Sequence, residues 1–506
     1  MAPVVLPGRL KAELYQYGVA SHRAGRFEEA EAAYRQVLAI DPADADTLHL
    51  LGVLADQLKQ HQRAIDFIRQ AIALRGDRPH YYNNAALALR SLERFEEAEA
   101  ACRTALRLNP AYLVAKSTLG MILRSAGRLD EALDCYRAAI LQRPDFTEAY
   151  NNLGNVLCQL GRHAEGETCF RHALRLPGHP PIHREAQCNL AQVLLLTGRL
   201  AEGWPYYEVR AEVNHAVRHD LDRPLWTGEP LGERVLLLHA EQGLGDTLQF
   251  CRYAPLVARG SKVVLEVQPP LLRLLSSLPG AVEIVAAGGT LPPHDFQCPL
   301  MSVPHLVGTV LETIPAEVPY LAAEPGTRAA WRRRLAGLGG LRVGLVWAGG
   351  FRPDQSGAIA VDRRRSITLG QMAPLARVSG VSFLSLQKGE PAAQAANPPE
   401  GMVLHDFTGD LADFTDTAAL IEALDLVISV DTAVAHLAGA LGKPVWLLNR
   451  YDTCWRWLLD RDDSPWYPSL RQFRQKAAGD WASVMIAVEA ALAQLVRDGA
   501  PPTREW

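Results

Sequence analysis

The chain has 506 residues, of which 48% are hydrophobic and 21% are charged. Both fractions are typical of folded proteins, and the length suggests about three domains of roughly 150 residues each. The 52 Lys and Arg residues are balanced by 56 Asp and Glu residues, which gives a net charge of −4. This balance argues against a protein that wraps nucleic acid or lies on an anionic membrane.

The first ten residues lack the apolar stretch and the small-residue cleavage pattern of a signal peptide. No segment approaches the roughly 18 consecutive apolar residues of a membrane helix. The eight cysteines form no C-x-x-C pair and stand singly in helical or strand-like patterns, as buried thiols do in a reducing compartment. We therefore expect a cytoplasmic protein without a metal site.

The first 210 residues contain an internal repeat. A small residue is followed twelve positions later by another, and this pair recurs at spacings of 34, 34, 34, 34 and 37 residues. A bulky residue usually follows four positions after the second member. Each period predicts two helices that small residues bring into close contact and that Gly or Pro ends. The pairs are Gly18/Ala30, Gly52/Ala64, Ala86/Ala98, Gly120/Ala132, Gly154/Gly166 and Ala191/Gly203.

Position, period and turn together resemble the tetratricopeptide repeat over six units. The resemblance implies an α-solenoid whose concave surface suits peptides or protein segments. The sixth unit is irregular, and its aromatic residues 204–207 predict a cap that docks on the part that follows. The amides of Asn83, Asn84, Asn151 and Asn152 either bind a peptide backbone or serve as solvated or capping residues.

After a linker at 211–233, rich in Pro and Gly, short apolar runs alternate with helical stretches. Such runs predict parallel sheets with right-handed crossovers. A break near 315–326 divides them into two doubly wound domains, at 234–325 and 326–506, that face a cleft with ligands at the carboxyl ends of the strands. The predicted strands are 235–239, 263–267, 282–285, 296–300, 342–347, 381–386, 402–405, 426–430 and 445–448, and the segment 328–338 is a predicted helix.

A glycine turn follows the first of these strands. Gly243 and Gly245 would let a backbone approach a ligand closely. The third glycine of a dinucleotide fingerprint is replaced by Leu248, although Glu266 is spaced like the acid that binds a ribose. A dinucleotide-dependent enzyme therefore stays an alternative.

Asp246, in the same turn, has two interpretations. As a carboxylate at the cleft it would act as a general base. As a helix N-cap, with Gln249 completing a capping pair, it would be structural, and the local sequence alone favours this second interpretation.

The strand at 426–430 ends at Asp431, and a helix begins directly after it. The free N–H groups of Thr432 and Ala433 would then bind a diphosphate at the helix N-terminus. His436, four residues after Thr432, either donates to a phosphate or sugar hydroxyl or packs as an ordinary helix residue.

Gln387 and Lys388 follow the strand at 381–386, at the same predicted sheet edge as Asp431. The ammonium of Lys388 would offset a diphosphate charge, unless it is a surface lysine in a loop. The aromatic residues Trp446, Trp455, Trp457, Trp466 and Tyr467 either stack on a base or sugar or, as is commoner, pack in the core.

Together these motifs resemble the heptosyltransferase-like glycosyltransferase family 9, in a form that follows tetratricopeptide repeats. The resemblance covers about residues 223–476 and rests on the segments 241–246, 364–366, 385–388, 431–436 and 464–468. It implies an α + α/β protein, in which a tetratricopeptide-repeat α-solenoid precedes a GT-B-like pair of doubly wound Rossmann-type domains. The acceptor side would be 234–325 and the donor side 326–506.

The family also implies an inverting sugar transfer from a nucleotide-diphospho-sugar, without a required metal or a further cofactor. Carried over, Asp246 is the catalytic base. The residues that hold the donor include the two glycines of the turn. The full set is Gly243, Gly245, Gln387, Lys388, Asp431, Thr432, Ala433 and His436.

The repeats make a protein or peptide acceptor more plausible than a lipopolysaccharide core, and the layout is also similar to the protein O-linked N-acetylglucosamine transferases. Two alternatives stay open. One is a catalytically silent scaffold for protein–protein interaction, and the other is a transferase that builds lipopolysaccharide or exopolysaccharide.

Overall fold

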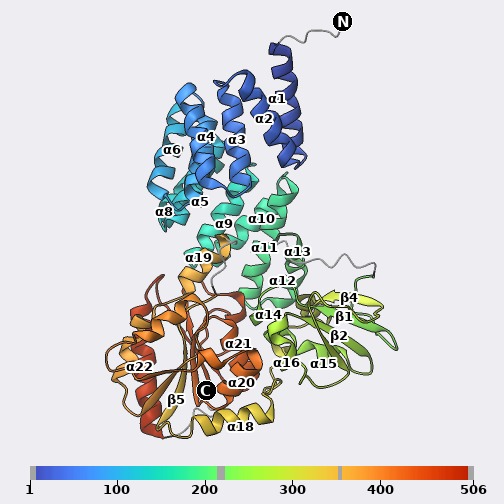
Figure 1. Cartoon of the computed structure of the whole chain (residues 1–506), viewed down its shortest axis with the longest axis vertical. Helices are drawn as coiled ribbons and strands as arrows, with labels where there is room; N and C mark the ends of the chain where they lie inside the picture. Colours follow the sequence, from blue (N-terminus) through green and yellow to red (C-terminus); the bar gives the residue numbers. More distant parts are fainter. Residues whose placement is uncertain (1–6, 214–222, 351–355, 500–506) are drawn as a thin grey trace. The chain divides into compact units, whose positions relative to one another are not determined.

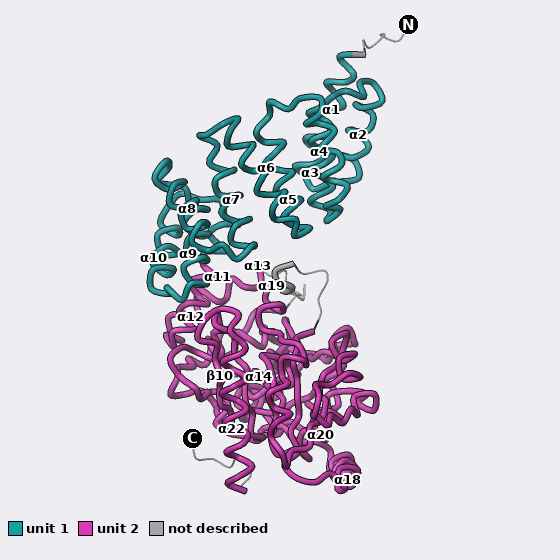
Figure 2. Tube along the Cα trace, turned by 90° about the vertical axis from the view of Figure 1, so that its left-hand side faces the viewer, with its two compact units in different colours: residues 1–186 teal, residues 187–506 magenta. Residues whose placement is uncertain are grey.

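The structure is a computed structural model that describes residues 7–213, 223–350 and 356–499. The chain divides into two compact units, residues 1–186 and 187–506, which are coloured teal and magenta in Figure 2. The sequence predicts a solenoid that extends to residue 210, whereas most of the sixth helix pair groups with the second unit. There the indole N–H of Trp204 donates to the carbonyl of Thr309 at 2.8 Å.

Unit 1 consists of antiparallel helix pairs joined by short turns, and most of its helices are labelled in Figure 1. Helices α3, α5, α7 and α9, the first of their pairs, also contact one another from pair to pair and form the inner layer. The helices are α1 (Pro7–Arg23), α2 (Phe27–Ile40), α3 (Ala45–Gln57), α4 (His61–Leu74), α5 (Pro79–Ser91), α6 (Phe95–Leu108), α7 (Leu113–Ser125), α8 (Leu129–Gln142), α9 (Thr147–Gln159), α10 (His163–Arg175) and the start of α11 (Pro180–Leu196).

The two helices of a pair fit together by complementary size. A Cβ atom added at Gly120 would lie 2.6 Å from the Tyr136 ring, and one at Gly154 would lie 2.6 Å from the Phe170 ring. The third repeat has Ala86 at this position, and there the opposing residue is the small Cys102. The repeat pattern in the sequence thus predicts the helix contacts of this unit correctly.

In unit 2, α12 (Leu200–Tyr207) and α13 (Arg210–Val213) precede a four-stranded parallel sheet. Its strands lie in the order β3-β2-β1-β4. They are β1 (Val235–His239), β2 (Lys262–Val267), β3 (Val282–Ala286) and β4 (Phe296–Pro299), connected through α14 (Leu244–Phe250), α15 (Tyr253–Val257) and α16 (Leu272–Leu275), with α17 (Val303–Leu306) after β4.

The second sheet of unit 2 has six parallel strands in the order β10-β9-β8-β5-β6-β7. Counted from β5, this order is 3-2-1-4-5-6, that of a doubly wound nucleotide-binding sheet, and the order reverses between β5 and β8. The strands are β5 (Leu341–Val346), β6 (Val381–Ser385), β7 (Leu404–Asp406), β8 (Leu426–Val430), β9 (Val445–Asn449) and β10 (Leu470–Arg474). The helices are α18 (Pro325–Arg334), α19 (Ser356–Arg365), α20 (Phe414–Glu422), α21 (Ala433–Ala440) and α22 (Trp481–Asp498).

The nine predicted strands all occur, with ends that shift by at most two residues, and the predicted helix 328–338 is α18, three to four residues earlier. Strand β10 was not predicted. Its sequence, Leu-Arg-Gln-Phe-Arg, carries charged residues because it pairs only with β9 at the sheet edge. The parallel α/β prediction is therefore correct, and its error lies at an edge strand in which polar Gln472 and two half-buried arginines interrupt the apolar run.

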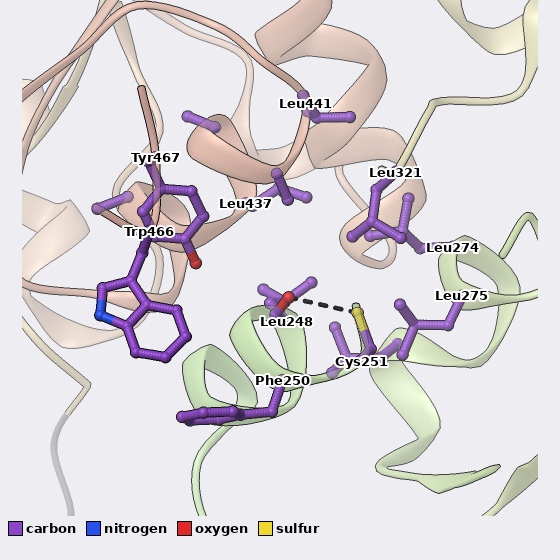
Figure 3. Packing of buried hydrophobic residues seen from close by; sticks show 14 of the residues in the cluster. Leu248, Phe250, Cys251, Leu274, Leu275, Leu321, Leu437, Leu441, Trp466 and Tyr467 are labelled. Atoms are coloured by element: carbon purple, nitrogen blue, oxygen red, sulfur yellow. Dashed lines mark hydrogen bonds between the residues drawn. The ribbon is translucent and has the colours of Figure 1, made fainter. Parts of the chain in front are cut away.

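One continuous hydrophobic cluster joins the two sheets of unit 2. In Figure 3, Leu248 and Phe250 of α14 face Leu437 of α21 together with Trp466 and Tyr467. A second cluster lies between the larger sheet and α22. None of the helices in the described ranges is long and apolar enough to cross a membrane.

Candidate functional site

The carboxyl edge of the larger sheet brings two of the predicted motifs to either side of β5. Gln387 and Lys388 follow β6, and Asp431 and Thr432 follow β8, and both strands pair with β5. Ligands of doubly wound sheets bind where the strand order reverses, which is here between β5 and β8. These residues therefore lie at the edge where this fold binds ligands.

Gln387 is buried and uses its whole hydrogen-bonding capacity inside the protein. Its Oε1 accepts from the N–H groups of Trp347 at 3.0 Å and Ala348 at 2.8 Å. Its amide nitrogen donates to the carbonyls of Ala348 at 3.1 Å and Lys388 at 3.0 Å. An amide side chain makes four such bonds at most, so Gln387 fixes the loop after β5 instead of offering a group to a ligand.

Lys388 is exposed, and its ammonium is nevertheless anchored. Nζ donates to the carbonyls of Thr408 at 2.8 Å and Leu411 at 2.9 Å. An ammonium has three donors, so one remains for an anion. The carbonyl bonds hold the positive charge beside the end of β6.

The first turn of α21 begins at Thr432, which is its N-cap. The hydroxyl of Thr432 lies 3.1 Å from that of Ser429 and makes no capping bond. A Cβ atom added at Gly245 of α14 would lie 3.7 Å from the backbone nitrogen of Ala433. Gly245 thus lets α14 pack against the first turn of α21. The close approach that this glycine permits is therefore to another helix of the same unit.

His436 is buried, as the packing interpretation expects. Its Nδ1 lies 2.9 Å from the Tyr467 hydroxyl, and its ring stacks on Trp457 with centroids 5.1 Å apart. Burial lowers the pKa of His436 to about 4, against the opposing effect of Asp431. The imidazole is therefore neutral at physiological pH.

Asp246 is the third residue of α14, and the N-cap is Gly243. The predicted N-cap position of Asp246 was therefore wrong by three residues, because the helix begins earlier than the sequence suggests. Its Oδ2 accepts from the Gly243 N–H at 2.9 Å, which is the return bond of a capping box. Its Oδ1 is paired with the guanidinium of Arg456.

Arg456 is a functional candidate that the sequence did not reveal. It lies in a short helical turn after β9, is 8% exposed, and donates through Nε to Oε1 of Gln249 at 2.9 Å. Its guanidinium carbon lies 4.4 Å from the ring centre of Trp455. Burial alone would lower the pKa of Arg456, but the Asp246 carboxylate raises this pKa above its usual value. The one sequence signal was an arginine between two tryptophans.

Glu241, which opens the matched turn, belongs to a second buried ion pair. Its Oε1 lies 2.6 Å from the guanidinium of Arg210 on α13. The same guanidinium donates to the Ser302 hydroxyl at 2.8 Å and to Glu208 at 2.8 Å. Burial alone would lower the pKa of Arg210, but the carboxylates of Glu241 and Glu208 raise it. The pair fixes the end of β1 and occupies Oε1 of Glu241.

The remaining sequence candidates are buried. The aromatic residues proposed for ring stacking are at most 5% exposed, so they pack in the core. Glu266, proposed as a ribose acid, is 2% exposed within β2, which removes the main support for a dinucleotide enzyme. In the described ranges no group of three His, Cys, Asp or Glu side chains could hold a metal ion. The aromatic residues that were proposed for ring stacking are Trp446, Trp455, Trp457, Trp466 and Tyr467.

Comparison with protein families agrees with both halves of this description. Tetratricopeptide repeat models match residues 22–88, 79–112, 120–161, 147–176 and 184–203. The model of glycosyltransferase family 9 (heptosyltransferase) matches residues 408–473, which contain Asp431, His436 and Arg456. The repeats suggest protein–protein interaction, and the family 9 match supports a glycosyltransferase with a nucleotide-sugar donor.

The chain is 30% identical over 511 residues to Protein FlbA of Caulobacter vibrioides, across 96% of this chain and 84% of FlbA. It belongs to the same family as Protein FlbA, and it is a tetratricopeptide-repeat protein with a C-terminal glycosyltransferase family 9 region.

Several solved structures are similar to part of the chain. A MamA protein is 26% identical, with 34% of this chain and all of that one covered and a TM-score of 0.30. The tetratricopeptide-repeat protein TTC0263 of Thermus thermophilus is 21% identical, with 37% of this chain and all of that one covered and a TM-score of 0.34. PilF of Pseudomonas aeruginosa is 19% identical, with 41% and 90% covered and a TM-score of 0.33.

Proposed function

We propose that this protein is an inverting, metal-independent glycosyltransferase. In this proposal the two sheets of unit 2 form a GT-B pair, the larger sheet binds a nucleotide-diphospho-sugar, and the acceptor is a protein or peptide that docks on the repeats. The family 9 match and the strand order of the larger sheet support the donor side.

The observation that carries the proposal is the position of Lys388 and Asp431 on either side of β5, where the strand order reverses. The remaining N–H of the Lys388 ammonium and the N–H groups at Thr432 and Ala433 would bind the diphosphate. Because two carbonyls already orient the ammonium, little reorganisation would be needed as charge develops on the leaving diphosphate.

Asp246 would act as the base. Each of its carboxylate oxygens makes one bond, to Gly243 or to Arg456, and each has a second lone pair for an acceptor hydroxyl. The oxygen of the acceptor forms the new bond to the anomeric carbon, the bond to the diphosphate breaks on the opposite face, and Asp246 takes the hydroxyl proton. Gln387 and Arg456 would position this machinery without touching the sugar.

The first test is thermal unfolding of the full chain with ADP, UDP, GDP and CDP. A diphosphate at about 100 times its dissociation constant should add about 2.7 kcal/mol to the stability of the unit that binds it. The shift should be selective for one base and should be lost in Lys388→Met, which keeps the aliphatic stem. Lys262→Met is the matched control, since Lys262 is an exposed lysine of the smaller sheet, paired with Glu283.

The second test uses the nucleotide-sugars of the selected base with a peptide mixture as acceptor. Asp246→Asn should lower the turnover number by about 100- to 10,000-fold. Full transfer by a folded Asp246→Asn protein would reject the base assignment. The absence of a shift with every diphosphate would reject the transferase proposal as a whole.

The second candidate is a repeat scaffold with a silent transferase unit. It is favoured by the internal use of Gln387, by the packing of His436 and by the contact of Gly245 with the first turn of α21. A protein partner that binds equally with and without nucleotide, and no nucleotide shift, would establish this candidate.

A further inference from the structure

Arg252, between α14 and α15, is a buried arginine that the proposed mechanism does not use. It is 4% exposed. In the described part of the chain its hydrogen bonds go to three carbonyls and one phenol, and no carboxylate pairs with it. Because a buried charge without a counter-charge is costly, the bonds that this guanidinium makes have to offset the cost.

The bonds of Arg252 join three segments of unit 2. Nε donates to the carbonyl of Gln249 at 2.8 Å, in the helix that carries Asp246. Nη1 donates to the carbonyl of Trp466 at 2.7 Å, between β9 and β10 of the larger sheet. It also donates to the carbonyl of Pro315 at 3.0 Å, in the segment that connects the two sheets. Directed bonds from one planar group thus fix the mutual placement of all three segments.

Tyr320 bonds the connecting segment to both sides. Its hydroxyl accepts from Nη2 of Arg252 at 2.8 Å and donates to the carbonyl of Leu248 in α14 at 2.8 Å. Its backbone N–H donates at 3.0 Å to the carbonyl of Ala440, the last residue of α21. Hinges are loop residues that absorb changes in φ and ψ. The sequence predicts a domain break in this segment, but its bonds to α14 and α21 oppose the motion of a hinge.

The guanidinium also lies against aromatic rings. Its central carbon is 4.3 Å from the ring centre of Tyr320 and 4.7 Å from that of Tyr467. The Tyr467 hydroxyl lies 2.9 Å from Nδ1 of His436, one of the candidate donor-binding residues. Arg252 therefore bonds directly to the helix of Asp246 and reaches His436 through Tyr467.

Apolar packing continues the same junction between the two sheets. Leu248 of α14 faces Leu437 of α21 in Figure 3. A Cβ atom added at Gly245 would lie 3.4 Å from Cα of Ala433, so the two helices are in close contact. Close-packed interiors have few voids and low compressibility. A rotation of one sheet against the other would therefore open this core and break the bonds of Arg252.

We propose that Arg252 is a positioning residue of the transfer reaction. It holds Asp246 at a fixed distance from the first turn of α21, so that the two sheets of unit 2 keep one arrangement throughout turnover. The inference rests on the proposed function, since the base and the donor are assigned there. A misplacement of about 1 Å between reacting groups costs about 100-fold in rate, so the effect of Arg252 falls on kcat.

The first test is the kinetics of Arg252→Met and Arg252→Lys in the full chain, with the nucleotide-sugar that the thermal shifts select. Arg252→Met should lower kcat by about 100-fold, while the nucleoside diphosphate should bind as tightly as before. Arg252→Lys keeps the charge but not the planar fork, so it should recover only part of kcat. A purely structural role would reduce the folded fraction and leave kcat per folded molecule unchanged.

Milder variants keep the test decisive if Arg252→Met does not fold. Tyr320→Phe removes one hydroxyl of the junction and should lower kcat about three- to tenfold. Tyr253→Phe, which removes a buried hydroxyl that lies 3.1 Å from that of Thr309, should leave kcat unchanged. Arg342→Met is the matched arginine control. It breaks an ion pair with Asp425 at the amino edge of the larger sheet and should lower stability but not kcat.

A second test measures the arrangement of the two sheets without turnover. Spin labels on unnatural amino acids at Lys262 of β2 and Ile486 of α22, both exposed, report the distance between the two sides by double electron–electron resonance. We expect one narrow distance that stays the same with ADP, UDP, GDP or CDP. In Arg252→Met, or in Tyr320→Phe, the distribution should broaden.

Two distances in the unchanged protein, or a distance that shifts with a nucleotide, would overturn the proposal. A folded Arg252→Met protein with unchanged kcat and an unchanged distance would do the same, as would equal losses in Tyr320→Phe and Tyr253→Phe. An unchanged protein that neither binds a nucleotide nor turns over would instead reject the proposed function. The distance measurement would then still decide whether Arg252 fixes the two sheets.

Discussion

The two units satisfy their charged side chains in opposite ways. In unit 1 most ion pairs are exposed and connect residues three or four apart, as between Arg162 and Glu165, or residues of the neighbouring repeat. In unit 2 buried arginines bind partners far away in the sequence, as when Arg252 donates to the carbonyl of Trp466, 214 residues later, at 2.7 Å. A repeat can therefore lose one pair with little effect, whereas the second unit depends on single contacts.

The largest effect is expected from Arg210→Met in unit 2. It leaves the Glu241 carboxylate buried without its cation, which should destabilise unit 2 by about 3–5 kcal/mol. The double variant Arg210→Met with Glu241→Gln should recover most of this loss. Urea unfolding followed by hydrogen exchange would assign the change to peptides of unit 2. A loss below about 1 kcal/mol would show that unit 2 does not depend on this single ion pair.

Acidification should destabilise both units by a similar amount. Burial lowers the pKa of His436 in unit 2 and of His49 in unit 1 to about 4, while an unfolded histidine titrates near 6.5. Between these values the unfolded chain binds more protons, so stability falls as the pH decreases through this range, by about 3 kcal/mol for each group.

This pH dependence is measured as the free energy of unfolding at several values from pH 7 to pH 4. His436→Gln and His49→Gln should each flatten the curve for their own unit. His179→Gln, at an exposed position of unit 1, serves as the control. Unchanged slopes in the first two variants would show that other groups cause the acid sensitivity.

A smaller effect is expected from Gly120→Ala in unit 1. The added methyl group would clash with the Tyr136 ring at a cost of about 1–3 kcal/mol, of which about 1 kcal/mol is regained from helix propensity. In a Tyr136→Cys background, which imitates Ala86 and Cys102 of the third repeat, the same substitution should be neutral or stabilising. The test is a double-mutant cycle, and additive effects would disprove size complementarity as the pairing rule.

The smallest effect is expected from the exposed ion pairs of unit 1. Arg162→Ala removes the 2.6 Å contact with Glu165 at the start of α10, which should cost at most about 0.5 kcal/mol. A loss of several kcal/mol on thermal unfolding would mean that these repeated pairs stabilise the solenoid as a network.

The contrast between local contacts in unit 1 and distant contacts in unit 2 also explains what the sequence could predict. Tyr136 and Gly120 lie sixteen residues apart and recur with the repeat period, so the packing of unit 1 follows from a local pattern. The parallel strands also follow from their apolar runs, except β10 at the edge. The strand ends carrying Lys388 and Asp431 were placed correctly because the fold class fixes which strand ends share an edge.

The contacts that decide what each candidate residue does were not predictable. Arg456 reaches Asp246 across 210 positions of the chain, and no spacing rule connects them. Gln387 looked like a ligand-binding amide, yet its four bonds go to backbone groups near the ends of β5 and β6. Local sequence reports residue type and position on an element, whereas hydrogen-bond saturation depends on what tertiary packing brings near.

The ion pair of Arg210 with Glu241 has a practical consequence for dissecting the chain. A truncation after the predicted linker, near residue 234, would look natural from the sequence. It would discard Arg210 and also Trp204, which bonds to Thr309. In the excised fragment the buried carboxylate of Glu241 would lack its cation. A recombinant form of unit 2 should therefore start before Pro180, so that it keeps the whole of α11 together with the second compact unit, which begins at residue 187.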